Sequence, residues 1–133
     1  MAGGTLNITG GTIKSNKAKE RDKDHTGNGG GIALSGGTVK ITNGILESNS
    51  ASSGEGGGVR VGSGGTFYFG GTTGNRGVIR SNSAKSNGGI SVHKNGRYVR
   101  NKDADGTRRG YVCKNNSPVN SYDTTPESDS HCT

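Results

Sequence analysis

One tetrapeptide pattern, Ser-Asn-x-Ala, occurs three times in this chain, as Ser15-Asn16-Lys17-Ala18, Ser48-Asn49-Ser50-Ala51 and Ser81-Asn82-Ser83-Ala84. Successive copies lie 33 residues apart. A fixed period of this length is typical of repeat proteins, in which each repeat is a small unit that buries its apolar face by stacking on its neighbours. The sequence therefore predicts a stack of similar coils instead of an ordinary globular core.

The residues around these asparagines repeat with the same spacing. A glycine stands five positions before each asparagine and an aliphatic residue three positions before it. The asparagines are Asn16, Asn49, Asn82 and Asn115, the glycines are Gly11, Gly44, Gly77 and Gly110, and the aliphatic residues are Ile13, Leu46, Ile79 and Val112. Stacked amide side chains can form hydrogen-bonded ladders, and glycine accepts turn conformations that other residues avoid. We therefore expect the asparagines and glycines to form a structural ladder at the turns.

Two further patterns predict strands. Gly-Gly-Thr precedes alternating apolar residues in three places, and Gly-Gly precedes two alternating aliphatic residues in three others. The first pattern begins at Gly3, Gly36 and Gly64, and the second begins at Gly30, Gly57 and Gly88. Alternation with a period of two is typical of a half-buried strand. We predict an all-β fold, a parallel β-helix (β-solenoid) with three short strands per repeat, and the usual hand of parallel crossovers makes it right-handed.

The repeats end before the chain does. The predicted units cover about residues 3–35, 36–63, 64–95 and a degenerate 96–116. These four rungs form one domain, residues 1–116. Residues 117–133 are acidic, rich in serine and threonine, and without apolar alternation, which predicts a flexible, disordered tail. The edge of the first rung would be open, so end-to-end self-association is expected.

The charge of the chain is strongly basic. Seventeen lysines and arginines against ten acidic residues give a net charge of +7. The candidate polyanion contacts are Arg97, Arg100, Arg108 and Arg109. Clustered arginines bind sulfated glycans or phosphates through charge alone, and the alternative for the same residues is a solvated loop without a partner. Nothing in the pattern predicts specific recognition of nucleic acid, and no apolar segment resembles a signal peptide or a membrane helix.

Catalytic and metal sites are not predicted. The acidic residues of the repeats are Glu20, Asp22, Asp24, Glu47 and Glu55. Three of them alternate with lysine and arginine in one charged segment, which is typical of a solvated loop, and the three histidines are widely scattered. The stretch 101–106 begins like a calcium loop, but Val112 stands where the bidentate glutamate should be. We therefore expect a protein without catalytic residues, cofactor or metal.

The two cysteines, Cys113 and Cys132, leave two interpretations open. Their separation matches no zinc-binding pattern. They form one disulfide if the protein works in an oxidising compartment, or they are two unrelated thiols.

The combination of Gly-Gly-aliphatic with aliphatic-x-x-Asn resembles the paired motifs of polymorphic outer-membrane proteins. The first motif falls on Gly30-Gly31-Ile32, Gly57-Gly58-Val59 and Gly88-Gly89-Ile90, and the second falls on 13–16, 46–49, 79–82 and 112–115. More broadly, the chain is similar to bacterial right-handed parallel β-helix proteins of pectin-lyase-like fold, including autotransporter passengers. The resemblance implies a non-enzymatic stalk or adhesin-like segment at the cell surface or secreted, which contacts a host-surface or extracellular glycan or protein. It would reach the outer membrane only through flanking parts.

A second function class shares this architecture. Polysaccharide lyases and hydrolases of pectin-lyase-like fold imply a carbohydrate-active enzyme fragment as the alternative. A glycan-binding module that uses the basic cluster is a further alternative. An enzyme would need clustered acids for calcium or two carboxylates across a cleft, and the spacing of the acidic residues does not predict either.

Overall fold

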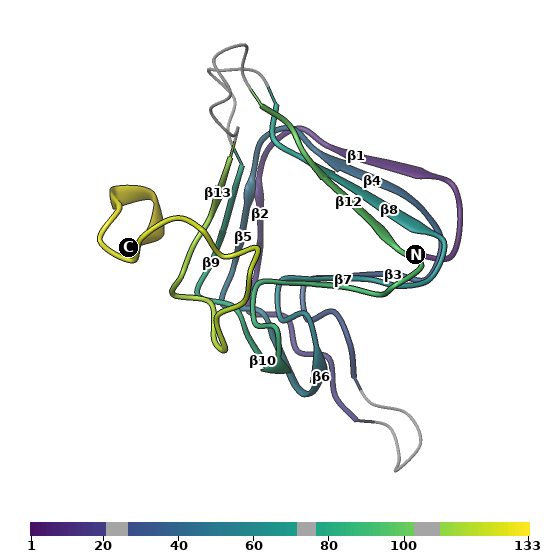
Figure 1. Cartoon of the computed structure of the whole chain (residues 1–133), viewed down its shortest axis with the longest axis horizontal. Helices are drawn as coiled ribbons and strands as arrows, with labels where there is room; N and C mark the ends of the chain where they lie inside the picture. Colours follow the sequence, from purple (N-terminus) through teal and green to yellow (C-terminus); the bar gives the residue numbers. More distant parts are fainter. Residues whose placement is uncertain (21–26, 72–76, 103–109) are drawn as a thin grey trace.

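The chain folds into parallel β-sheets. Its computed structural model (Figure 1) describes residues 1–20, 27–71, 77–102 and 110–133. These residues contain thirteen short strands and a single 3-10 helix, η1 (Ser130–Cys132), and every strand pairing among them is parallel. The predicted all-β character with parallel sheets is confirmed.

The strands belong to four separate sheets. The first sheet contains β1 (Thr5–Ile8), β4 (Gly37–Ile41), β8 (Gly65–Phe69) and β12 (Arg97–Arg100). The second contains β2 (Thr12–Lys14), β5 (Ile45–Glu47), β9 (Val78–Arg80) and β13 (Tyr111–Val112). The third contains β3 (Ile32–Leu34), β7 (Val59–Val61) and β11 (Ile90–Val92), and the fourth contains β6 (Ser50–Glu55) and β10 (Ser83–Ser86).

The chain visits these sheets in the same order each time, and we call each round a pass. The first pass contains β1 to β3, the second β4 to β7, the third β8 to β11, and the fourth β12 and β13. Isolated bridges from Lys17 to Ser50 and from Ser83 to Ser117 bring the first and fourth passes beside the fourth sheet. Each pass therefore lies directly on the next.

The core consists of side chains that repeat from pass to pass. Leu46 has Ile13 as its register partner on one side and Ile79 on the other. The buried residues of the main cluster come from the first three sheets, which Figure 1 shows around a common interior. Phe67 stacks on Phe69 and on Tyr98, with ring centroids 5.9 and 5.6 Å apart. Small aliphatics and a few rings thus fill the core in layers.

Two details differ from the prediction. Each complete pass has four strands instead of three, because the Ser-Asn-x-Ala segment continues as β6 or β10 and its Ala51 is fully buried. The predicted flexible tail, residues 117–133, has defined contacts. Its Thr125 forms a bridge with Cys113, and Cys132 is buried. The tail is held because it supplies partners to the last pass, which a reading of strand periodicity does not detect.

Candidate interaction surfaces

A ladder of asparagine side chains crosses the passes. Asn16 Nδ2 donates to Asn49 Oδ1, Asn49 Nδ2 donates to Asn82 Oδ1, and Asn82 Nδ2 donates to Asn116 Oδ1, each over 3.0 Å. The second hydrogen of each later amide goes to a backbone carbonyl of the preceding pass, as in the 2.9 Å bond from Asn49 to Ile13. Asn49 and Asn82 are fully buried. Their amide groups avoid the cost of burying unpaired polar atoms because each has partners on both sides.

The second glycine of each Gly-Gly pair packs against this ladder. A Cβ atom on Gly31 would lie 3.0 Å from Asn49 Nδ2, and one on Gly58 would lie 3.1 Å from Asn82 Nδ2. A side chain at either position would displace the amide. The two motifs seen in the sequence therefore meet in space, and the glycine makes room for the asparagine of the following pass.

In the fourth pass, the predicted member of the asparagine ladder is wrong by one residue. The asparagine that continues the ladder is Asn116, not Asn115. The fourth pass contains one extra residue at this corner, where Asn116 N donates back to Cys113 O. Asn115 instead accepts a hydrogen bond from Ser81 N and donates to the carbonyl of Cys132. A strict spacing of 33 residues could not detect this one-residue insertion.

The ladder ends at the carboxylate of Asp123. Asn116 Nδ2 donates to Asp123 Oδ1 over 2.9 Å, and Asn120 N donates to Asp123 Oδ2 over 2.8 Å. Asp123 is only 3% exposed. Burial raises the pKa of this carboxyl to about 6, although its two hydrogen bonds act in the opposite direction. The segment predicted to be a loose tail thus supplies the last acceptor of the ladder.

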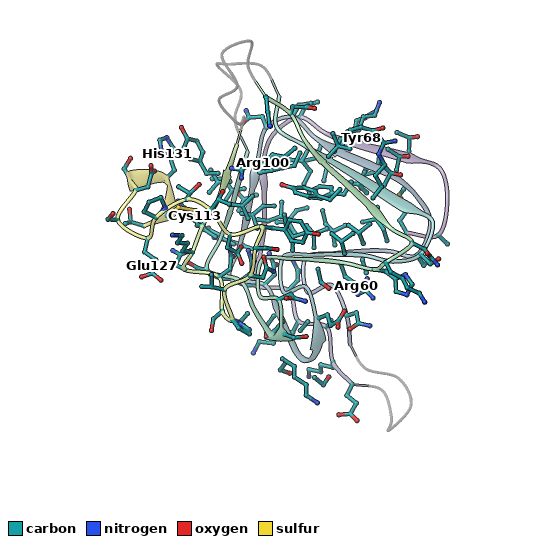
Figure 2. All side chains as sticks on the ribbon, in the orientation of Figure 1. Arg60, Tyr68, Arg100, Cys113, Glu127 and His131 are labelled. Atoms are coloured by element: carbon teal, nitrogen blue, oxygen red, sulfur yellow. A yellow bond between two sulfur atoms is a disulfide. The ribbon has the colours of Figure 1, made fainter. Side chains whose placement is uncertain are left out.

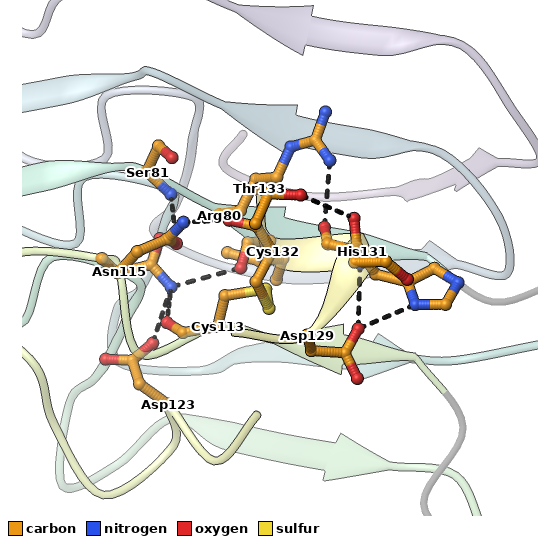
Figure 3. Close-up of a disulfide and its surroundings, with 12 residues drawn as sticks. Arg80, Ser81, Cys113, Asn115, Asp123, Asp129, His131, Cys132 and Thr133 are labelled. Atoms are coloured by element: carbon orange, nitrogen blue, oxygen red, sulfur yellow. Dashed lines mark hydrogen bonds and ion pairs between the residues drawn. A yellow bond between two sulfur atoms is a disulfide. The ribbon is translucent and has the colours of Figure 1, made fainter. Parts of the chain in front are cut away.

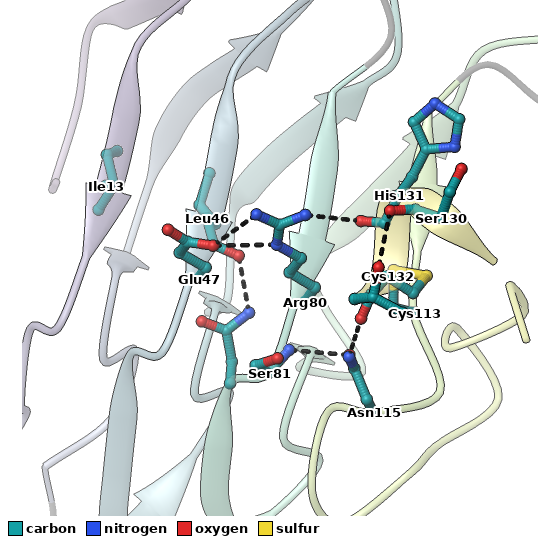
Figure 4. Close-up of polar contacts among 12 residues, drawn as sticks. Ile13, Leu46, Glu47, Arg80, Ser81, Cys113, Asn115, Ser130, His131 and Cys132 are labelled. Atoms are coloured by element: carbon teal, nitrogen blue, oxygen red, sulfur yellow. Dashed lines mark hydrogen bonds and ion pairs between the residues drawn. A yellow bond between two sulfur atoms is a disulfide. The ribbon is translucent and has the colours of Figure 1, made fainter. Parts of the chain in front are cut away.

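A disulfide between Cys113 and Cys132 fastens the same segment (Figure 3). Of the two interpretations that the sequence left open, the structure has the disulfide, and both cysteines are fully buried. The ring of the neighbouring His131 stacks on Tyr111 with centroids 4.0 Å apart. We call residues 113–132, which cover the fourth pass, the cap. Arg80 of the third pass connects the cap to the second pass, because it donates to His131 O over 2.9 Å and pairs with Glu47 over 2.8 Å (Figure 4).

The first pass presents an open face at the other end of the stack. We call a set of residues that are register partners from pass to pass a column. In the column Leu6, Val39 and Phe67, Leu6 is 43% exposed, whereas Val39 and Phe67 are 0% exposed. Lys14 and Asn16 are also exposed. We call the outer edge of β1 and β2, with Asn16, the open face. It exposes side chains that the same repeat positions bury elsewhere.

The predicted glycine series lies at the corners before the second sheet. Gly11, Gly44 and Gly110 have positive φ angles of 86°, 119° and 82°. A Cβ atom on Gly77 or on Gly110 would lie 2.7 or 2.8 Å from the ring of Phe69. The glycines of the later passes therefore give the phenylalanine ring its space in the core.

The predicted basic cluster is not assembled among the described residues. Arg97 is exposed on β12, while Arg100 has the core residue Phe69 as its register partner. Arg100 donates to Thr124 Oγ1 over 2.7 Å and to Gly110 O over 2.6 Å, so it holds the cap in place. Arg108 and Arg109 lie outside the described residues.

The acidic residues considered for catalysis lie apart. Glu47 pairs with Arg80, Glu55 pairs with Arg60 over 3.0 Å, and Glu20 is exposed. Asp22, Asp24 and His25 lie outside the described residues, as does most of the stretch that resembles the start of a calcium loop. Across 1–20, 27–71, 77–102 and 110–133, no three acidic, histidine or cysteine side chains gather as a metal site would require.

A polar groove beside the fourth sheet was not predicted. It has a volume of about 540 Å³ and is lined by Asn28, Ser53, Glu55, Arg60 and Lys85, among others. Arg60 comes from β7, the central strand of the third sheet, and lies on the side of that sheet that faces the fourth sheet (Figure 2). Ser91 donates to Glu55 over 3.0 Å and helps to hold the carboxylate. Because the lining residues come from several strands, no sequence motif predicts the groove.

No protein-family model, curated protein or solved structure matches this chain. In the part of the chain that the structure describes, no helix has the length and apolar character needed to cross a membrane.

Proposed function

We propose that this chain is a right-handed parallel β-helix of about four rungs that serves as a non-enzymatic stalk or adhesin-like segment of a surface-exposed or secreted protein. The observation on which the proposal rests is that successive passes place the same kinds of residue at the same positions of the repeat. Inward columns and the asparagine ladder continue through every pass and end in a cap built from residues 113–132. A structure of this kind builds length and outward surface, and each rung depends mainly on its neighbours.

The disulfide supports the location that we propose. Disulfides form and persist in oxidising environments such as the periplasm, the cell surface and the extracellular medium. Cys113 and Cys132 close a loop with a sequence separation of 19 residues. A loop of this size contributes about 3 kcal/mol in the chain-entropy model, so the cap would depend on an oxidising compartment.

An in-register insertion tests the architecture. Duplicating residues 50–82 directly after Asn82 adds one complete 33-residue pass, with an asparagine, a Gly-Gly pair and every core position in phase. We expect a folded, strand-rich protein by circular dichroism, with a melting temperature equal to or above that of the original chain. X-ray scattering should show a particle longer by about 4.8 Å.

The matched control carries a shuffled insertion of the same 33 residues. It should lose cooperative melting or form a disordered bulge, because its residues cannot continue the columns. Equal behaviour of the two insertions would argue against stacked rungs, as would a repeat insertion that fails to fold.

The adhesive role is tested with a sulfated glycan. Arg97 is an exposed cation near the capped end of the stack. We expect the protein to bind heparin in a salt-dependent way, and Arg97→Ala to weaken binding several-fold. Lys14→Ala removes the same charge at the opposite end and is the control. Equal losses in the two variants would indicate attraction to net charge only, and absence of binding by the original chain would remove the glycan from the proposal.

A further inference from the structure

We propose that the open face binds an extended polypeptide segment that forms one more parallel coil, with an asparagine placed against Asn16 and an acidic residue placed against Lys14. This inference rests on the proposed β-helix architecture and names its partner. The partner is defined by four features of the face: its hydrogen bonds, its apolar side chains, its charge and its spacing.

The asparagine ladder has a direction, and this direction specifies the missing partner. Asn49 accepts two hydrogen bonds at Oδ1 from the preceding pass, one from Asn16 N over 3.1 Å and one from Asn16 Nδ2 over 3.0 Å. Asn82 accepts the same pair from Asn49. No described residue donates to Asn16 Oδ1. An asparagine one coil further out would supply both donors, and the carbonyl three residues before it would accept the second hydrogen of Asn16 Nδ2, as the carbonyl of Ile13 does for Asn49.

The apolar residues of the open face match a second strand with alternating side chains. Leu6, Ile8 and Ile13 occupy the columns that hold Val39, Ile41 and Leu46 in the second pass. The second-pass residues are buried because they are covered on both sides, whereas the first-pass residues are covered on one side only. Among the residues that the structure describes, none pairs with the outer backbone edge of β1, and such an edge is a template for strand addition.

The charge of the open face favours an acidic partner over a second copy of the same face. The column that contains Lys14 continues with Glu47 and Arg80, and Glu47 pairs with Arg80. Lys14 makes no ion pair with the residues described. If the charges in this column continue to alternate, the residue that the next coil places against Lys14 is acidic. Lys17 is exposed on the same pass. Two copies joined by this face would bring basic side chains together, which like-charge repulsion disfavours.

The chain itself contains a segment with the required spacing. Residues 36–50 carry Val39, Ile41 and Leu46 at the apolar positions, Glu47 in the column of Lys14, and Asn49 in the column of Asn16. This segment already lies on the inner side of the first pass. A synthetic copy of it would therefore have the correct spacing for the outer side.

A labelled peptide with the sequence of residues 36–50 is the probe, titrated into the full-length oxidised protein and followed by fluorescence anisotropy. We expect saturable binding that Lys14→Glu weakens about tenfold. Lys94→Glu makes the same charge change just after β11, away from the open face, and should leave the affinity unchanged. A peptide with Glu47→Lys should bind the Lys14→Glu protein about as well as the original pair bind each other.

Two further peptides test the ladder and the sequence. A peptide with Asn49→Leu keeps the apolar pattern and should bind about tenfold more weakly, since Asn16 Oδ1 would then lose its side-chain donor, and the leucine could not bond to the first pass through an amide. A scrambled peptide should not bind. Equal binding of the original and the Asn49→Leu peptides would overturn the placement of an asparagine against Asn16.

Three other outcomes would overturn the docking proposal. The first is that the peptide does not bind although the in-register insertion variant folds. The proposed β-helix would then stand, and the proposed docking would be wrong. The second is a dimer of the chain alone that the peptide dissociates, because the face would then take a second copy. The third is faster hydrogen exchange in β4 on adding peptide, because the peptide would then replace the second pass. Failure of the insertion variant itself would instead remove the proposed function.

Discussion

The two ends of the stack use the same repeat positions in opposite surroundings. Ile13 in the first pass and Val112 in the fourth are members of one column, yet Ile13 is half-buried and Val112 is fully buried. Residues 113–132 lie against the fourth pass, whereas no described segment covers the outer side of the first pass. The position of a residue in the repeat determines the direction of its side chain, but its neighbours determine its burial.

The polar groups differ between the ends in the same way. Asn116 is hydrogen-bonded on both sides, because it accepts from Asn82 and donates to the carboxylate of Asp123, which completes the ladder. Asn16 bonds only toward the second pass. A repeat protein needs terminal units that satisfy or hide these groups. The capped end does so with one carboxylate and one disulfide, and the open end leaves them available.

The largest expected difference between interior and end comes from one column of the core. Ile79→Ala removes a fully buried side chain between Leu46 and Val112, and we expect it to cost about 4 kcal/mol of unfolding free energy. Ile13→Ala makes the same chemical change at the open face and should cost about 1 kcal/mol. Urea unfolding of both variants measures the difference. Equal costs would show that the open face is covered in solution.

A second test uses pH to address the capped end alone. The pKa of Asp123 is raised from 3.8 to about 6, so between these values the folded state holds a proton that the unfolded state releases. Its contribution to stability is fully present below about pH 4 and is lost as pH rises through 6, by up to about 3 kcal/mol. Asp123→Asn should remove this part of the pH dependence. Urea unfolding between pH 4 and 7 gives the comparison, and parallel profiles for the two proteins would refute it.

The smallest of these effects concerns the ladder. Asn82→Ala removes the oxygen that accepts from Asn49 N and Nδ2, and it removes the side-chain donor to the carbonyl of Leu46, so we expect a loss of about 2 kcal/mol. Asn16→Ala should cost less than about 1 kcal/mol, since the side chain is exposed and bonded on one side. Thermal melts of this matched pair would sharpen the comparison. A larger loss for Asn16→Ala than for Asn82→Ala would contradict the description of the two ends.

Much of the fold was predictable from the repeat because identical surroundings select similar residues. The spacing of Ile13, Leu46 and Ile79 located one sheet and its register, and the Gly-Gly pairs located another. The fourth sheet was missed because β6 and β10 consist of small and polar residues without apolar alternation. The strand signal in the sequence is an alternation of polarity, and these strands do not have it.

The cap was not predictable for a different reason. Asp123 and Cys132 belong to no repeat, so periodicity contains no information about them. Their roles depend on the return of the chain across the last pass, which places a carboxylate against Asn116 and a thiol against Cys113. The same return path made Asn116 the last asparagine of the ladder and left Asn115 to bond with Ser81 and Cys132.

The sequence by itself determined the period, the strand class and the inward columns, because these depend on local alternation and on a spacing of 33 residues. Only the tertiary structure decided which end is closed, that burial raises the pKa of Asp123 to about 6, and that Arg80 has an acidic partner among the described residues while Lys14 has none. These properties depend on neighbours that lie far apart in the chain. Burial, charge pairing and hydrogen-bond satisfaction are set by contacts across passes, and a repeat motif describes only one side of each contact.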